Sequence, residues 1–147
     1  MTDDDRNAAA HQMAADMRVQ MGRLRRRMRE EVQFTDMTWP QLAVLTRLDR
    51  DGPATVTALA KAEGMRSQSM GELILPLKAA GHVAGKADPS DGRQTVLALT
   101  ATGRALIALR RASFEDWLAS AILQKLSPDE QTHLATAIGL LARLVDP

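Results

Sequence analysis

The sequence predicts a mainly α-helical protein with one small β-sheet, and three observations lead to this prediction. The chain has 147 residues, which suits a single domain with its own hydrophobic core. Apolar residues recur at helical spacing over most of the length, whereas they alternate with their neighbours only in residues 94–99. Hydrophobic residues make up 45% of the chain and aromatic residues only 3%, so leucine, alanine and methionine must build the core.

The first predicted helix spans about residues 8–33, because apolar side chains three or four residues apart form one stripe along it. That stripe consists of Met13, Met17, Met21, Leu24, Met28 and Val32. A second helix is predicted from Thr38 to about Arg50. Thr38 and Gln41 have the spacing of a capping box, and Pro40 suits the first turn of a helix.

Two short helices are predicted next, joined by a tight turn. The first lies within residues 55–63, with Leu59 and Ala60 facing inward, and Gly64 is expected to close it in the left-handed conformation. The second helix, residues 67–80, begins almost immediately after Gly64. Two helices joined so closely must cross at a steep angle.

A β-hairpin is predicted after the second short helix. Residues 82–86 and 93–99 flank a turn at Asp88–Gly92, which gives a loop of roughly four to six residues. Two helices complete the chain, one capped by Thr100 and the other starting with the capping box Ser127–Glu130. Their apolar positions are Leu106, Leu109, Trp117, Leu118 and Ile122 in the first and Leu134, Ile138, Leu141 and Val145 in the second.

Two short helices with a glycine turn, followed directly by a hairpin, describe a winged helix-turn-helix, a fold that reads DNA. The second short helix begins with polar residues that a recognition helix would present to base edges: Arg66, Ser67, Gln68 and Ser69. Gln68 could bind adenine through two hydrogen bonds, and the serines could donate to bases or phosphates. A simpler role for Ser67, as the N-cap of the helix, is compatible with DNA contact.

The hairpin carries the remaining candidate DNA contacts. Arg93 is predicted on the strand that leaves the turn, where its guanidinium could enter a narrow minor groove. Asp91 could orient Arg93, or it could be a turn residue whose side chain bonds its own backbone. Lys86, on the opposite strand, is a candidate phosphate contact.

At these residues the chain resembles the MarR family of bacterial transcriptional regulators. The segments Asp88–Arg93 and Leu97–Gly103 are similar to that family's wing and to the start of its next helix. The segments Thr38–Gln41 and Leu77–Gly81 are similar to the start of its second helix and the end of its recognition helix. The resemblance covers roughly residues 10–145 in order, and the wing motif is its most specific part.

The resemblance implies a single MarR-like chain over residues 1–147 with two regions. A helical dimerisation region would comprise residues 8–33 and 100–146, and a winged DNA-binding region residues 36–99. It further implies a homodimer on a pseudo-palindromic, double-stranded DNA operator, acting as a repressor. Family members commonly release DNA when a small aromatic or anionic effector binds. Independently, the apolar stripes of the outer helices exceed what one small winged domain could cover.

Two features bear on this expectation. Pro76 lies inside the predicted recognition helix, where it removes one backbone hydrogen bond, so we expect a bend or an altered packing angle. Met37 and Trp39, at the entry to the second helix, could line an effector-binding crevice. Alternatively, an apolar residue before a helix can act as a hydrophobic staple.

Several function classes are disfavoured. The chain contains no cysteine, which excludes disulfides, thiolate metal sites and thiol-based redox sensing. The histidines, His11, His82 and His133, are widely separated and lack metal-ligand spacing, so we expect no metal and no cofactor. The chain lacks a phosphate-binding glycine loop and a nucleophile elbow, and we expect no enzyme activity.

The acidic start of the chain does not resemble a secretory signal, and no apolar run reaches the roughly 20 residues of a membrane span. We therefore expect a cytoplasmic protein. The net charge of +1 gives no general attraction to polyanions, so a basic surface must come from local clustering. That near-neutral charge supports one alternative, a winged-helix adaptor that binds another protein instead of DNA.

Overall fold

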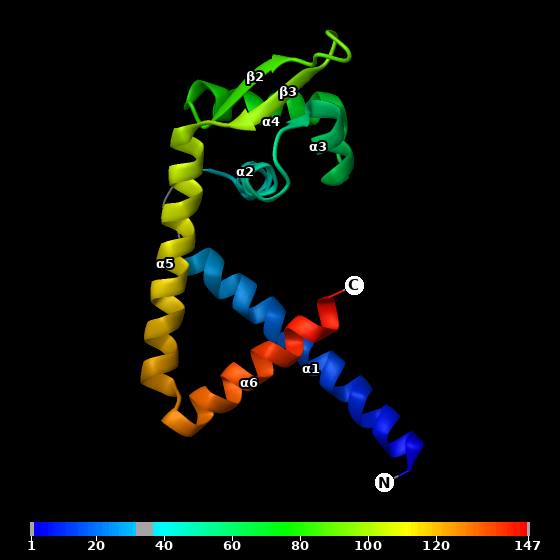
Figure 1. The fold of residues 1–147 in the computed structure, drawn as a ribbon, viewed down its shortest axis with the longest axis vertical. Helices are drawn as coiled ribbons and strands as arrows, with labels where there is room; N and C mark the ends of the chain where they lie inside the picture. Colours follow the sequence, from blue (N-terminus) through cyan, green and yellow to red (C-terminus); the bar gives the residue numbers. More distant parts are fainter. Residues whose placement is uncertain (1, 32–36, 147) are drawn as a thin grey trace. The chain divides into compact units, whose positions relative to one another are not determined.

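The computed structural model describes residues 2–31 and 37–146, and it confirms a mainly helical fold with a small antiparallel sheet (Figure 1). The helices of the described residues are α1 (Asp3–Glu31), α2 (Trp39–Asp51), α3 (Val56–Ala62), α4 (Ser67–Ala79), α5 (Ala101–Lys125) and α6 (Pro128–Val145). The strands are β1 (Ala54–Thr55), β2 (Val83–Ala87) and β3 (Thr95–Leu99).

The chain divides into two compact units, and the division falls within α5. One unit comprises residues 34–111 and is called the winged unit below. The other comprises residues 1–33 and 112–147 and is called the helical unit. Each unit is described separately.

The buried core of the described residues lies in the winged unit. Leucine, valine, isoleucine, alanine and methionine build it, as the composition indicates. It consists of Val44, Leu45 and Leu48 from α2, Leu59 and Ala60 from α3, Met70, Ile74 and Leu77 from α4, Val83 from β2, Leu97 from β3, and Ile107 from α5. Because every element of the unit contributes at least one of these residues or packs beside them, the core fixes the positions of the helix-turn-helix and the hairpin together.

The sheet has three strands, in the order β1-β3-β2, and both pairings are antiparallel. The hairpin register pairs Val83 with Leu99, and β1 adds a pairing between Thr55 and Val96. The sequence did not indicate β1, because two residues are too short to show an alternating pattern. Thr55 also caps α3, since its Oγ1 accepts a hydrogen bond from the amide of Ala58 at 3.1 Å. β1 therefore ties the start of α3 to the hairpin.

Both predicted capping boxes are confirmed. At the start of α2, the Thr38 hydroxyl accepts from the Gln41 amide at 3.4 Å, and the Gln41 side chain accepts from the Thr38 amide at 2.9 Å. Ser127 and Glu130 make the equivalent pair at the start of α6, at 3.3 and 2.7 Å. These helix starts depend on residues three positions apart, so they are visible in the sequence.

The predicted start of the first helix at residue 8 is wrong, because α1 begins at Asp3. Thr2 and Asp5 exchange hydrogen bonds there: the Thr2 amide donates to the Asp5 carboxylate at 2.8 Å, and the Asp5 amide donates to the Thr2 hydroxyl at 3.2 Å. The hydrogen bonds from Thr2 also lower the pKa of Asp5. The predicted end of this helix at residue 33, and its apolar residue Val32, lie outside the described residues.

The helical unit exposes much apolar surface. Along α6, none of the residues is buried, although many are aliphatic. The large exposed apolar side chains of this unit are Met13, Val19, Met21, Leu24, Leu123, Ile138, Leu140, Leu141, Leu144 and Val145. Around Trp117, Phe114 lies 5.7 Å away between ring centroids, and the Arg27 guanidinium lies 5.7 Å from the indole ring. No helix among residues 2–31 and 37–146 is long and apolar enough to cross a membrane.

Candidate nucleic-acid interface

The turn between α3 and α4 has the geometry that the sequence predicts. Gly64 has a φ of +66°, in the left-handed region where side chains are disfavoured. The amide of Met65 donates back to the carbonyl of Ala60 at 2.9 Å, which closes the end of α3. Leu59 and Met70, one on each helix, are fully buried and hold the two helices together. α4 is thus placed by the core and not by its own exposed residues.

The polar residues at the start of α4 are all exposed: Arg66, Ser67, Gln68 and Ser69. Arg66 is the N-cap, with extended backbone angles, and its side chain makes no capping hydrogen bond. The alternative assignment of Ser67 as the N-cap is therefore wrong. Since no side chain caps the first turn of α4, its amides remain available to an acceptor such as a phosphate.

The wing loop, residues 88–94, is held by its own aspartates. The Asp88 carboxylate accepts from the Ser90 amide at 2.9 Å and from the Ser90 hydroxyl at 2.8 Å. These hydrogen bonds lower the pKa of Asp88. The Asp88 amide in turn donates to the carbonyl of Gln94 at 2.9 Å, which closes the loop at its base. Figure 1 shows the loop projecting from the end of β2 and β3 opposite to α5.

Arg93 lies in this loop and not on a strand, because β3 starts only at Thr95. The strand placement predicted from the sequence is therefore wrong, and the loop is longer than predicted. Asp91 Oδ1 accepts from the Arg93 amide at 3.1 Å, so of its two predicted roles the structure shows the hydrogen bond to the loop backbone. The Arg93 side chain is exposed. Lys86 lies on β2, as predicted, opposite Val96 and exposed.

An ion pair that the sequence did not indicate supports the helix-turn-helix. Arg47 of α2 donates through Nε to the Glu63 carboxylate at 2.7 Å, and both side chains are mostly buried, with 28% and 23% exposed. Glu63 is the C-cap of α3 and follows its last residue directly. This pair joins α2 to the turn that precedes α4. Its partners are 16 positions apart, and no local pattern connects them.

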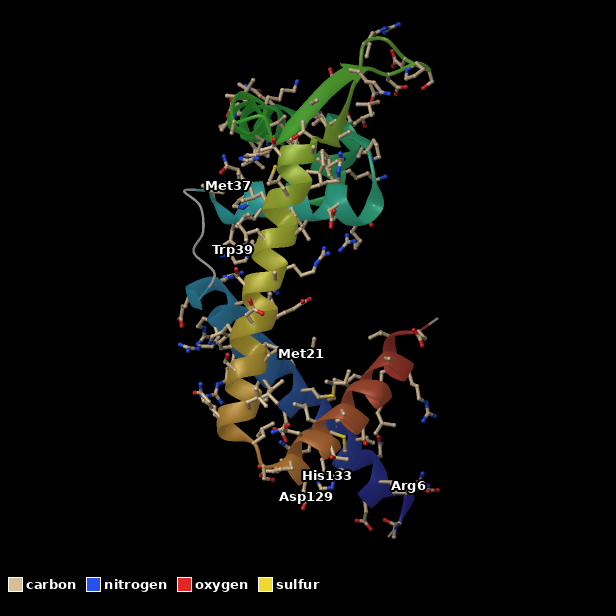
Figure 2. The ribbon with its side chains drawn as sticks, turned by 60° about the vertical axis from the view of Figure 1, so that its left-hand side comes forward. Arg6, Met21, Met37, Trp39, Asp129 and His133 are labelled. Atoms are coloured by element: carbon tan, nitrogen blue, oxygen red, sulfur yellow. The ribbon has the colours of Figure 1, made fainter. Side chains whose placement is uncertain are left out.

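A second group of side chains lies at the entry to α2, and the sequence indicates only some of its members (Figure 2). Met37 is partly buried and packs against the core of the winged unit. Trp39 is 39% exposed, and the Arg110 guanidinium lies 4.9 Å from its ring centroid. The buried Nε of Arg110 makes no hydrogen bond with any described residue, and burial lowers the pKa of this guanidinium. The sequence singled out Met37 and Trp39, but nothing in it related Arg110 of α5 to either residue.

The comparisons with known proteins agree with this geometry. A family model described as the MarR family matches residues 37–95. An HTH-type transcriptional regulator of Mycobacterium tuberculosis is 33% identical over 134 residues, which cover 91% of this chain and 93% of that protein. An uncharacterized HTH-type transcriptional regulator of Mycobacterium bovis matches with the same identity and coverage.

Solved structures share the fold. The crystal structure of a candidate transcriptional regulator from Pseudomonas aeruginosa superposes with a TM-score of 0.80 and 36% identity, and covers 93% of this chain and 95% of that one. Wild-type MarR from E. coli, in its apo form, superposes with a TM-score of 0.74 over 90% of this chain and 96% of its own. At 21% identity, the E. coli structure supports the fold alone.

Proposed function

This chain belongs to the MarR family of transcriptional regulators, and we propose that it is a repressor that binds a pseudo-palindromic DNA operator as a homodimer. Residues 36–99 bind DNA in this proposal. Residues 8–33 and 100–146 join the two subunits. A small aromatic or anionic molecule releases the complex from DNA.

The proposal rests on the polar residues at the start of α4. Its residues Arg66, Ser67, Gln68 and Ser69 are exposed, polar and positioned by a buried core. A recognition helix needs this combination, because base readout requires hydrogen-bonding side chains held at a fixed angle to the groove. Gln68 binds an adenine edge in this assignment, and the serines and free amides of the first turn bind phosphate oxygens.

The wing supplies the second contact. Arg93 enters the minor groove next to the recognition site, where a narrow groove concentrates negative potential. Asp91 and Asp88 act indirectly, because their hydrogen bonds hold the loop backbone before DNA arrives. Lys86 contacts a phosphate from β2. Since the loop is ordered in advance, binding costs less conformational entropy than folding a disordered wing would.

The effector site is assigned to Met37, Trp39 and Arg110. Trp39 offers an aromatic face, and Arg110 offers a cation whose Nε has no hydrogen-bond partner among the described residues. A planar anion would gain both stacking and a charge-assisted hydrogen bond at this place. Loss of binding of aromatic carboxylates in Arg110→Gln, measured by isothermal titration calorimetry, is the expected result. Unchanged binding would contradict this assignment.

Selection from random duplex DNA at moderate salt tests the DNA-binding function. Wild type should recover a pseudo-palindrome, and Arg93→Ala and Gln68→Ala should lose or relax it. Affinity for the recovered site should fall steeply as salt rises, because phosphate contacts release counterions. No enriched site from a protein that is dimeric in solution would contradict operator binding. It would instead favour the alternative, a winged-helix adaptor with a protein partner.

A further inference from the structure

The outward face of α4 has further exposed residues beyond those of its first turn. Met70, Ile74 and Leu77 face the core and are buried. At 3.6 residues per turn, the opposite side of the helix carries Gln68, Glu72 and Leu75 in one line. All three side chains are exposed, and Leu75 is 64% exposed. The face that would meet a DNA groove therefore presents an amide, a carboxylate and an aliphatic side chain in succession.

Glu72 is poorly explained as an ordinary surface residue. It makes no ion pair with any residue that the structure describes. The neighbours that could pair with it on the helix surface, three or four positions away, are uncharged: Gln68, Ser69, Leu75 and Pro76. A carboxylate on a DNA-facing surface is repelled by phosphates, and a hydrogen bond donated by the DNA would offset that repulsion.

Leu75 is an exposed apolar side chain on the same face of α4. Exposed leucine is common on proteins, but this one lies next to Glu72 on the exposed side of α4. Exposed apolar area costs about 25 cal/mol per Å² relative to burial. An apolar partner on the DNA would remove this cost, and the major groove offers one such group, the methyl of thymine.

On the basis of the proposed DNA-binding function, we propose that Glu72 and Leu75 determine operator specificity together with Gln68. Glu72 accepts a hydrogen bond from the exocyclic amino group of cytosine. That group is a major-groove donor that a carboxylate can select, whereas the O6 and N7 acceptors of guanine would repel it. Leu75 covers the methyl group of a thymine.

The helix geometry fixes the order of these contacts. At 1.5 Å per residue, Glu72 lies about 6 Å along the axis from Gln68, and Leu75 lies about 4.5 Å further. Base pairs stack about 3.4 Å apart. A helix lying along the major groove therefore reads an adenine with Gln68, a cytosine about two steps on with Glu72, and a thymine about one step beyond with Leu75. After Leu75, Pro76 and Ala79 offer no side-chain hydrogen-bonding group, so the line of base contacts ends there.

The test repeats the selection from random duplex DNA with Glu72→Ala and Leu75→Ala. Asp4→Asn serves as the control, because Asp4 is an exposed carboxylate on α1 that lies outside the winged unit and outside the residues proposed to join the subunits. Glu72→Ala should lose about tenfold discrimination for cytosine at one position of each half-site, the size typical of one specific base contact. It should also bind unrelated DNA more tightly, because a negative charge has been removed. Asp4→Asn should recover the wild-type consensus.

A chemical change in the DNA tests Leu75 without relying on the variant alone. Deoxyuridine lacks the thymine methyl group, so replacing each thymine of the selected half-site in turn should identify one position where wild type loses about threefold in affinity. Leu75→Ala should be insensitive to that replacement. If wild type selects an operator but both variants keep its consensus and its deoxyuridine response, the specificity proposal is wrong and the DNA-binding function stands. If wild type selects no operator, both proposals fail.

Discussion

At the scale of single residues, Gly103 shows how closely the hairpin packs against α5. A Cβ atom built at Gly103 would overlap the backbone carbonyl oxygen of His82, which itself accepts a hydrogen bond from the amide of Thr100. Neither group can move without disturbing the junction between β3 and α5. The glycine is therefore required by space and not by its own backbone conformation, because its φ is not positive.

Gly103→Ala should lower the free energy of unfolding by about 2 kcal/mol, as expected when a tightly packed site is overfilled. Gly71→Ala is the matched control, since Gly71 lies within α4 and a Cβ there meets nothing within 4 Å. The control should be neutral or stabilise the protein by about 0.5 kcal/mol, through helix propensity. Denaturant unfolding of the two variants measures both effects. Equal stability of the variants would contradict the close packing at Gly103.

The aspartates of the wing give a prediction for pH. The pKa of Asp88 is lowered mainly by the hydrogen bond from the Ser90 amide. A lowered pKa in the folded loop means that the ionised carboxylate stabilises the loop above the ordinary aspartate pKa of about 3.9. This contribution is lost as the pH falls through the folded pKa of Asp88.

In an NMR titration, the Asp88 carboxyl and the Ser90 amide should therefore shift together with a midpoint below about 3.9. Asp88→Asn should abolish the Ser90 transition, because asparagine keeps an acceptor but does not titrate. A midpoint at or above the ordinary value would show that the loop is not held in this way. So would a Ser90 transition that persists in Asp88→Asn.

At the scale of elements, the sequence predicted structure wherever the cause was local. The capping boxes at Thr38 and Ser127 depend on residues three positions apart, and the structure contains both. The strand β1 was missed because its two residues are defined only by pairing with β3. Arg110 was missed for the same reason, since its contact with Trp39 joins distant parts of the chain. Arg93 was misplaced because the hydrogen bonds of Asp88 and Asp91 lengthen the loop.

Pro76 lies inside α4, although proline disfavours the interior of a helix. α4 is continuous from Ser67 to Ala79 with Pro76 inside it, although proline gives the Glu72 carbonyl no amide partner. Burial of Met70, Ile74 and Leu77 compensates for that loss. α4 therefore continues through Pro76, and the bend or altered packing angle that the sequence predicts stays a prediction.

Pro76→Ala should raise the free energy of unfolding by about 1–2 kcal/mol, because it restores one helical hydrogen bond at an exposed position where little packing is lost. The gain is smaller than the full cost of a mid-helix proline, since alanine also loosens the unfolded chain. Lys78→Ala serves as the control, because it leaves the backbone unchanged. Ala79→Pro would not serve, because it would add a second break to the helix. Thermal unfolding should separate the variants, and a Pro76→Ala protein no more stable than Lys78→Ala would contradict the argument.

At the scale of the whole molecule, the helical unit exposes apolar side chains whose contact with water is unfavourable. We expect a second copy of the chain to cover them. Leu141 and Ile138 lie on one side of α6 and are 41% and 57% exposed, far more than an aliphatic stripe along a helix normally leaves in water. Leu141→Glu should therefore convert the dimer to monomer in sedimentation velocity experiments at micromolar concentration. Thr136→Glu, on the opposite side of α6, carries the same charge and should remain dimeric. Because the proposed operator has two half-sites, we expect Leu141→Glu to lose operator affinity as well, while circular dichroism shows that the winged unit stays folded. A monomeric wild type, or a dimeric Leu141→Glu, would contradict the prediction that the helical unit forms the dimer interface.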